Sequence, residues 1–307
     1  MEIMKKLLLV FSVLLVLAVM AACAGGTPAA PPTLDVDLTN ADQQAPPVEQ
    51  NGQNAEEVIS TPNLDAIRDR GYLIVGVFGE TPPFGYVTAD GEHAGRDIYI
   101  ARRFAYELFG DADAVQFVIT EAANRIEFLR SYRVDVIIAN FTVTEERAEQ
   151  VDFALPYSRV ALGIVAPEGN DIQSVADLNG RDLIVTQGTT AEIYFTQNHP
   201  EINLVRFQQN TESFAALQDG RGDAMAHDNT LLFVWAYENE GFRIVEGNLG
   251  NPDVLAPAVR QNSEDLLEWL NETTLRLRDE EFFYHVFEMT MRDYFHPDTQ
   301  PSDVMYN

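Results

Sequence analysis

From about residue 57 onward, short runs rich in Val, Ile and Leu alternate with longer stretches in which apolar side chains recur every three or four positions. The short runs predict strands over residues 73–77, 115–119, 134–139, 183–186, 204–207, 224–226 and 243–245. The longer stretches predict helices over residues 98–108, 124–131, 191–198, 212–219, 230–238 and 264–278. This alternation predicts an α/β fold whose open, largely parallel sheets are covered by helices on both faces. Ligands of such sheets bind beyond the carboxyl ends of the strands.

The amino terminus has a different pattern. An apolar run over residues 7–22 follows Lys5 and Lys6 and ends in small residues immediately before Cys23. This layout predicts an export signal over residues 1–22, since the run is shorter than the roughly 20 residues of a spanning helix. Cys23 is the only cysteine, which excludes an intramolecular disulfide. Residues 20–23 resemble a bacterial lipobox, with Met20 where Leu is usual, so we expect lipidation of Cys23; the alternative is ordinary signal cleavage with an incidental cysteine.

Residues 23–56 are rich in Ala, Pro, Gln, Asn and Asp and show no apolar period. This composition predicts a disordered tether. Behind a lipidated cysteine, it would hold the following domain away from the membrane surface.

The formal net charge of the 307-residue chain is −28, and its two lysines both lie in the predicted signal. Such a chain lacks the clustered Lys and Arg that bind nucleic acid or an anionic lipid surface. The acidic residues are scattered rather than grouped, so we interpret them as a solubilising surface.

Three segments that follow predicted strands carry a resemblance. They read VDVIIANFTVTEER at residues 134–147 with VDFALPY at 151–157, QGTT at 187–190, and DAMAHD at 223–228. Together they resemble the polar amino-acid class of solute-binding proteins of ABC importers, over nearly all of residues 57–307. The resemblance implies the two-lobed periplasmic binding fold of type II, with the ligand in the interlobe cleft. Lobe 1 would comprise residues 57–158 and 256–307, and lobe 2 residues 159–255.

The resemblance also implies a location and partners. The protein would be an extracytoplasmic, lipid-anchored monomer that carries a polar amino acid to the membrane subunits of an ABC permease. No cofactor or metal is expected.

The first segment suits a carboxylate. Thr142 offers a hydroxyl and Asn140 an amide, while Thr144 can cap a short helical turn that returns Arg147 toward the same strand end. A guanidinium presents paired donors that match a carboxylate. The resemblance implies that Thr142 and Arg147 hold the α-carboxylate of the ligand. The alternative for Arg147 is a surface salt bridge with a neighbouring acid.

The other two segments begin helices. Thr189 or Thr190 can cap the helix that follows Gly188, where free N–H groups favour an anion. The resemblance implies that Thr190 contacts the ligand carboxylate and that Asp228 receives the α-ammonium; from the residues alone, Asp228 is equally a helix cap. We interpret His227 as structural, since no second His lies at metal-ligand spacing.

Four residues are expected around the ligand side chain. The resemblance implies that Phe84 supplies an apolar floor and that Glu80 reaches the rim, and it departs at Arg96, where an aromatic residue is usual. Arg125 aligns with an arginine of members selective for acidic amino acids, which favours glutamate or aspartate, then glutamine. The alternatives are that Arg96 turns outward at its helix start and that Arg125 pairs with Glu121 or Glu127 on the surface.

Two rival functions remain open. Some proteins of this fold act as dehydratases of small carboxylic acids, and others present an amino acid to a signalling partner. No Ser-His-Asp, Cys-His or metal-ligand pattern emerges from the sequence, so we expect a binding protein and not an enzyme.

The lipobox resemblance makes a direct prediction: the mature membrane-bound protein begins at a lipidated Cys23. Mass spectrometry of its amino-terminal peptide checks this. A soluble product that retains a free cysteine, or one cleaved at another bond, would show ordinary signal processing instead.

Overall fold

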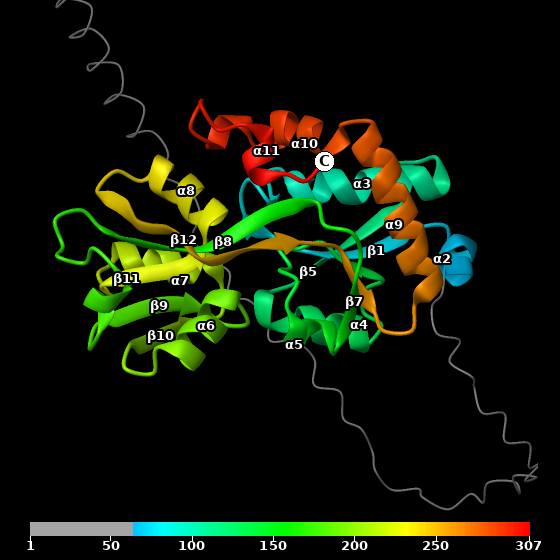
Figure 1. Ribbon diagram of the computed structural model, residues 1–307. Helices are drawn as coiled ribbons and strands as arrows, with labels where there is room; N and C mark the ends of the chain where they lie inside the picture. The colour runs from blue at the N-terminus through cyan, green and yellow to red at the C-terminus, as the bar shows by residue number, and fades with distance from the viewer. Residues whose placement is uncertain (1–63) are drawn as a thin grey trace, which may run out of the picture. The chain divides into compact units, whose positions relative to one another are not determined.

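A computed structural model describes residues 64–307 (Figure 1). The predicted export signal, Cys23 and the predicted tether lie outside the described residues. Within the described part of the chain, no helix has both the length and the apolar character needed to cross a membrane.

The first lobe is built on a five-stranded sheet in the order β5 (Val115–Ile119), β1 (Leu73–Val77), β6 (Val136–Ile137), β13 (Ala258–Arg260) and β7 (Val151–Phe153). Its helices are α2 (Leu64–Arg70), α3 (Arg96–Phe109), α4 (Arg125–Arg130), α5 (Glu145–Ala148), α9 (Glu264–Asp279), α10 (Phe282–Thr290) and α11 (Pro301–Val304), with the short 3-10 turns η1 (Ala122–Asn124) and η3 (Arg292–Tyr294). A small antiparallel sheet of β2 (Glu80–Thr81), β3 (Gly85–Val87) and β4 (His93–Ala94) follows β1.

The second lobe is built on a sheet in the order β10 (Asn203–Phe207), β9 (Asp182–Thr186), β11 (Ala224–Asp228), β8 (Ser158–Pro167) and β12 (Phe242–Leu255). Helices α6 (Thr190–Asn198), α7 (Asn210–Gln218) and α8 (Asn229–Glu238) and the 3-10 turn η2 (Val175–Leu178) complete it. The sheet with α6, α7 and α8 runs from green through yellow to the orange end of β12 in Figure 1.

The long strands β8 and β12 connect the two sheets. They pair antiparallel from Phe242 opposite Pro167 to Leu255 opposite Ser158. At that end, single bridges join Leu255 to Thr142 and Ser158 to Met305, both in the first lobe. The chain therefore leaves the first lobe through β8 and returns through β12.

The expectation of largely parallel sheets was wrong. In each five-stranded sheet two strand pairings are parallel and two are antiparallel. The antiparallel pairings of these two sheets all involve β8, β12 or β13, because a chain that crosses to the second lobe and returns runs in the opposite direction on its way back. Strand β12 is also much longer than the predicted residues 243–245, since three register shifts along it interrupt the alternation of side chains that marks a strand.

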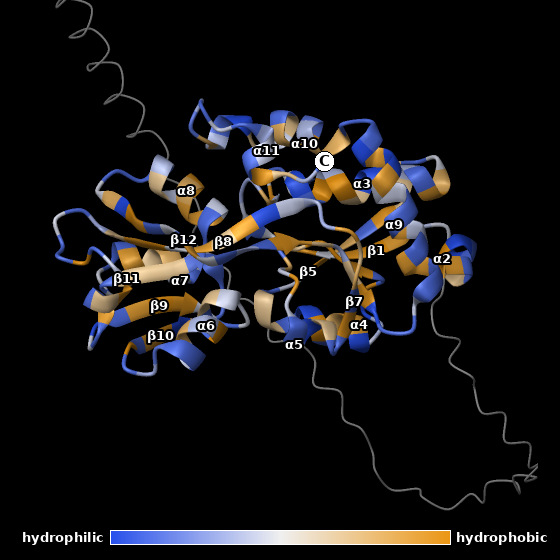
Figure 2. Ribbon diagram, in the orientation of Figure 1, coloured by the Kyte–Doolittle hydropathy of each residue, from blue (hydrophilic) through white to orange (hydrophobic). Residues whose placement is uncertain are grey.

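The apolar periodicity predicts the cores well. Central strands such as β1 and β9 are almost wholly buried, and Figure 2 shows the hydrophobic colouring concentrated on such strands. Helix α3 buries Ile98, Ala101, Phe104 and Ala105, as its spacing predicts. These cores fix the strand ends on which the polar residues lie.

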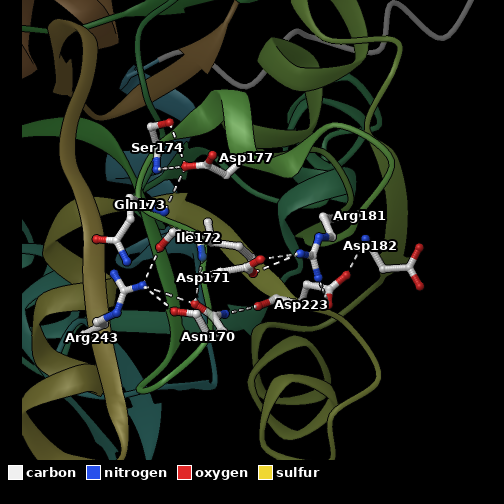
Figure 3. Close-up of polar contacts among 10 residues, drawn as sticks. All are labelled: Asn170, Asp171, Ile172, Gln173, Ser174, Asp177, Arg181, Asp182, Asp223 and Arg243. Atoms are coloured by element: carbon white, nitrogen blue, oxygen red, sulfur yellow. Dashed lines mark hydrogen bonds and ion pairs between the residues drawn. The ribbon is translucent and has the colours of Figure 1, made fainter.

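The loop that follows β8 is held in place by polar contacts (Figure 3). Arg243 of β12 donates to the side-chain oxygen of Asn170 at 3.1 Å, and Arg181 forms ion pairs with Asp171 at 2.9 Å and Asp223 at 3.7 Å. These pairs of the second lobe are partly exposed, so each contributes only about 0.2–1 kcal/mol.

Candidate functional site

Side chains from both lobes line a small cavity of about 10 Å³, which has room for about one water molecule. The first lobe contributes Phe78, Ala122, Arg125, Asn140, Thr142 and Arg147, and the second contributes Thr189, Thr190, His227 and Asp228. Seven of the ten predicted ligand-binding residues are thus brought together. An amino acid, the ligand that the resemblance implies, is larger than this cavity, so the side chains that line it would have to rearrange around such a ligand.

Arg147 lies in the cavity wall with only 5% of its surface exposed. Thr144 caps α5 as predicted and accepts from the Arg147 N–H at 3.2 Å. The guanidinium donates to the Thr142 carbonyl at 2.7 Å and, across the cleft, to the Gly188 carbonyl at 2.9 Å. Burial lowers the pKa of Arg147 to about 10, against the opposing effect of Asp228. The alternative of a surface salt bridge was wrong.

Arg125 is buried beside it and meets the same carbonyl. It donates to the carbonyls of Ala122, Ala139 and Asn140 at 2.8–3.0 Å and to that of Gly188 at 3.0 Å, and its guanidinium lies 4.4 Å from the Phe141 ring centroid. Burial, followed by the charge of Arg147, lowers its pKa well below the ordinary arginine value. Surface pairing with Glu121 or Glu127 was therefore wrong. Four of its five N–H donors bond to carbonyls, so one is left for a ligand.

Gly188 brings the second lobe against the first. Its φ of 74° lies in the left-handed region, and a Cβ there would stand 2.5 Å from the Cα of Ala123 in η1. Glycine alone allows this approach without a clash. The approach places the Gly188 carbonyl where both guanidiniums reach it.

The second-lobe residues present oxygen atoms. Thr189 caps α6, accepting from Glu192 N–H at 3.3 Å, and Thr190 donates to an Asp228 carboxylate oxygen at 3.4 Å. Asp228 occupies the N-cap position of α8, yet its side chain makes no capping hydrogen bond. The carboxylate therefore remains directed to the cavity that it lines.

Three predicted residues do not line the cavity. Glu80 accepts from Thr211 at 2.7 Å across the exposed rim of the lobes. Phe84 is fully buried below Arg96, whose guanidinium lies 4.8 Å from its ring. Arg96 is itself fully buried, so the outward alternative was wrong; it pairs with Asp97 at 2.8 Å and donates to Asn140.

Three lining residues were not predicted to bind: Phe78, Ala122 and His227. Phe78 follows directly after β1, a position at a strand end that could have marked it. His227 has a structural role, as interpreted from the sequence. Its Nδ1 accepts from the Asp228 N–H at 2.7 Å, and its Nε2 lies 3.0 Å from the Asn210 side-chain oxygen. These partners fit a neutral ring that carries its proton on Nε2.

Metal chemistry has no candidate ligand set in the described residues. Between residues 64 and 307, no group of three or more His, Cys, Asp or Glu side chains is placed to hold a metal ion.

Comparison with known proteins agrees with this geometry. Residues 73–288 match the family model of bacterial extracellular solute-binding proteins, family 3. The structure is similar to the cysteine-binding protein of Campylobacter jejuni, at 49% identity and a TM-score of 0.78 over 80% of this chain and 98% of that one. It is similar to the L-cysteine solute receptor of Neisseria gonorrhoeae, at 46% identity and a TM-score of 0.78 over 80% and 100% of the two chains. The ABC transporter glutamine-binding protein of Bacillus subtilis is 29% identical over 79% of this chain and 89% of its own.

The close approach at Gly188 predicts that Gly188→Ala weakens amino-acid binding by about ten-fold or more, because a Cβ would hold the lobes apart at η1. The matched control is Gly220→Ala. Gly220 has a similar φ of 70° in the second lobe, but a Cβ there would meet no atom within 4 Å. Both variants bear the cost of a left-handed alanine, about 1 kcal/mol. The ligand is first chosen as the amino acid that raises the melting temperature of the wild-type protein most. Calorimetry then compares the affinities of the two variants for it, and equal affinities would contradict the role of Gly188 in closure.

Burial lowers the pKa of His227 below 6.5. The unfolded chain therefore binds the proton first as pH falls, and the free energy of unfolding should decrease below pH ~6.5 by up to about 1.4 kcal/mol per pH unit from this residue. Denaturant unfolding at several pH values measures the slope. His227→Gln should reduce it, whereas His296→Gln, at an exposed ring, should not. A slope unchanged in His227→Gln would refute the assignment.

Proposed function

The chain belongs to family 3 of the bacterial extracellular solute-binding proteins, which are amino-acid-binding components of ABC importers and not enzymes. Within this family, we propose that its ligand is L-cysteine. The observation that carries the proposal is sequence identity. The chain is 49% and 46% identical to the two cysteine-binding structures over nearly their whole length, but 29% and 32% identical to two glutamine-binding relatives.

The α-carboxylate of the ligand would bind beside Arg147. The Gly188 carbonyl now accepts from both Arg147 and Arg125, and a carboxylate offers more acceptor sites and a full negative charge to the same donors. The Thr142 hydroxyl lies on the same cavity wall. Exchange of a neutral carbonyl for an anion at two buried cations supplies the driving force for binding.

The α-ammonium would bind at Asp228, on the opposite wall. Asp228 is the only carboxylate among the ten lining residues. If it pairs with the α-ammonium, no acid in this lining remains for a guanidinium or ammonium on the ligand side chain. The site therefore favours a neutral side chain over arginine, lysine or histidine.

The hypothesis that the ligand is glutamate or aspartate rested on Arg125, which was expected to bind the side-chain carboxylate of the ligand. The carbonyl contacts of Arg125 give that hypothesis little support, because a single N–H donor is left. Glutamine is the second candidate, on account of the glutamine-binding relatives. The thiol of cysteine, short and nearly apolar, requires no further charged partner.

We also propose that a lipid on Cys23 holds the protein at the membrane, where it delivers the amino acid to its permease. The solitary cysteine at the end of an export signal supports this anchoring.

A thermal-shift screen of residues 57–307 against the common amino acids, under reducing conditions, tests the ligand. L-Cysteine at ~1,000 times its Kd should add about 4 kcal/mol to the free energy of unfolding, more than L-serine or L-glutamine at the same concentration. A larger thermal shift with L-glutamine would favour the second candidate. The absence of a shift with every amino acid would contradict both candidates.

Arg147→Ala should abolish binding of every amino acid rather than alter the preference, because the α-carboxylate is common to all. Loss of one partner of a buried charge pair costs roughly 2–5 kcal/mol. Calorimetry checks this, with Arg181→Ala as the matched control, since Arg181 pairs with Asp171 on the exposed surface. An affinity within a few-fold of wild type would show that Arg147 does not bind the α-carboxylate.

A further inference from the structure

Behind the cavity wall, Arg96 belongs to a buried polar cluster that the binding residues do not include. Its guanidinium lies close to two aromatic rings, 4.8 Å from the centroid of Phe84 and 5.0 Å from that of Tyr157. Its Nε pairs with Asp97 at 2.8 Å, and both side chains are completely buried. Contacts with two rings and an ion pair through Nε restrict the plane of the guanidinium, so the remaining N–H groups point in set directions.

One of those N–H groups meets Asn140. The Nη2 of Arg96 donates to the side-chain oxygen of Asn140, and Nη1 donates to the Ser158 hydroxyl at 3.4 Å. A guanidinium has donors and no acceptor. Only the oxygen of the amide can face it, which means that Arg96 dictates the orientation of the Asn140 amide, and the NH₂ end is turned the other way.

The NH₂ end of Asn140 has no partner. Asn140 lines the cavity and is 3% exposed, and its Nδ2 is buried without a hydrogen bond. Its backbone is also fixed, by a left-handed φ of 45° and by a hydrogen bond of 2.8 Å from Arg125 to its carbonyl. A buried donor without an acceptor is costly, so an acceptor on a ligand is strongly favoured there.

We propose that Arg96 is a positioning residue that orients the Asn140 amide so that its NH₂ group donates to the α-carboxylate of the bound amino acid. The proposal rests on the amino-acid site described above. Arg96 does not touch the ligand; it acts through Asn140. The Asp97 carboxylate keeps the buried cation paired, and the two rings restrict the orientation of its plane.

The first test is Asn140→Asp. Asp tolerates a left-handed φ nearly as well as Asn and can pair with Arg96, so the fold should persist. The substitution replaces the NH₂ donor by an anionic oxygen that repels a carboxylate. L-Cysteine affinity, measured by calorimetry, should fall by about 100-fold or more. Affinity within three-fold of wild type would overturn the proposal.

The second test is a double-mutant cycle that separates positioning from general structure. Arg96→Met should weaken binding about ten-fold in the wild-type chain, but less than two-fold in an Asn140→Gly chain, which keeps the left-handed backbone and lacks the amide. A purely structural role for Arg96 would give the same loss in both backgrounds, which would overturn the proposal.

Arg96→Met leaves Asp97 without its partner and could prevent folding. The thermal unfolding of each variant is therefore measured first, to establish that it is folded. If Arg96→Met does not fold, Arg96→Lys takes its place in the cycle. Lysine keeps the charge and is also a donor without an acceptor. It should then weaken binding by no more than about three-fold, and a loss above ten-fold in both the wild-type and the Asn140→Gly chain would overturn the proposal.

The ligand assignment fails separately. If wild type does not respond to L-cysteine but binds another amino acid, the proposed ligand is wrong, and the same variants are measured with that amino acid, since it carries the same α-carboxylate.

Discussion

Two buried guanidiniums facing one carbonyl oxygen are the constraint on which this site depends. Burial lowers the pKa of both Arg125 and Arg147. The charge of Arg147 lowers the pKa of Arg125 further, whereas Asp228 opposes the decrease in both. Removing two cations from water is expensive unless their donors are satisfied. The carbonyls of Ala122, Ala139, Asn140, Thr142 and Gly188 accept six hydrogen bonds from the two guanidiniums, four from Arg125 and two from Arg147, but a carbonyl carries only a partial charge. The site is therefore stable as a folded structure and electrostatically incomplete, which is the condition that favours an anionic group.

The fold supports this arrangement by ending its strands at the right place. Strand β6 ends at Ile137, and the chain then turns through Asn140 in a left-handed conformation, so that two successive carbonyls, those of Ala139 and Asn140, face Arg125. Across the cleft, Gly188 brings its own carbonyl to the same guanidiniums. Because β8 and β12 are the strands that connect the lobes, any separation of the lobes would break the Gly188 contacts and leave the first-lobe carbonyls in place.

The sequence predicts the elements better than the connections between buried polar groups. Strands β1 and β5 have the predicted bounds, and helices α6, α8 and α9 differ from theirs by a residue, because burial of apolar side chains determines them and leaves a period in the sequence. The Thr144 cap is also local, since a threonine before a short helical turn marks it, whereas the roles of Thr142 and Arg147 were implied only by the resemblance of residues 134–147. Arg96 could not be placed this way. Its position depends on Phe84, Tyr157 and Asn140, which approach it only in the folded chain, and an arginine at a helix start ordinarily predicts exposure. The resemblance likewise implied that Glu80 reaches the rim of the pocket, and its partner there, Thr211 of the other lobe, approaches it only in the folded chain.

The charge of the whole chain bears on which ligand suits the buried cations. A formal charge of −28 generates a field that opposes the approach of a net anion, and salt weakens this field beyond about 10 Å without reversing it. A zwitterion with a neutral side chain has no net charge on which the long-range field acts. In the proposed site the same molecule would present its carboxylate to Arg147 and its ammonium to Asp228, both of which line the cavity. The acidic surface thus favours a ligand that is neutral as a whole, and the cationic cavity favours one that carries a carboxylate; the proposed L-cysteine meets both conditions, whereas glutamate would meet only the second.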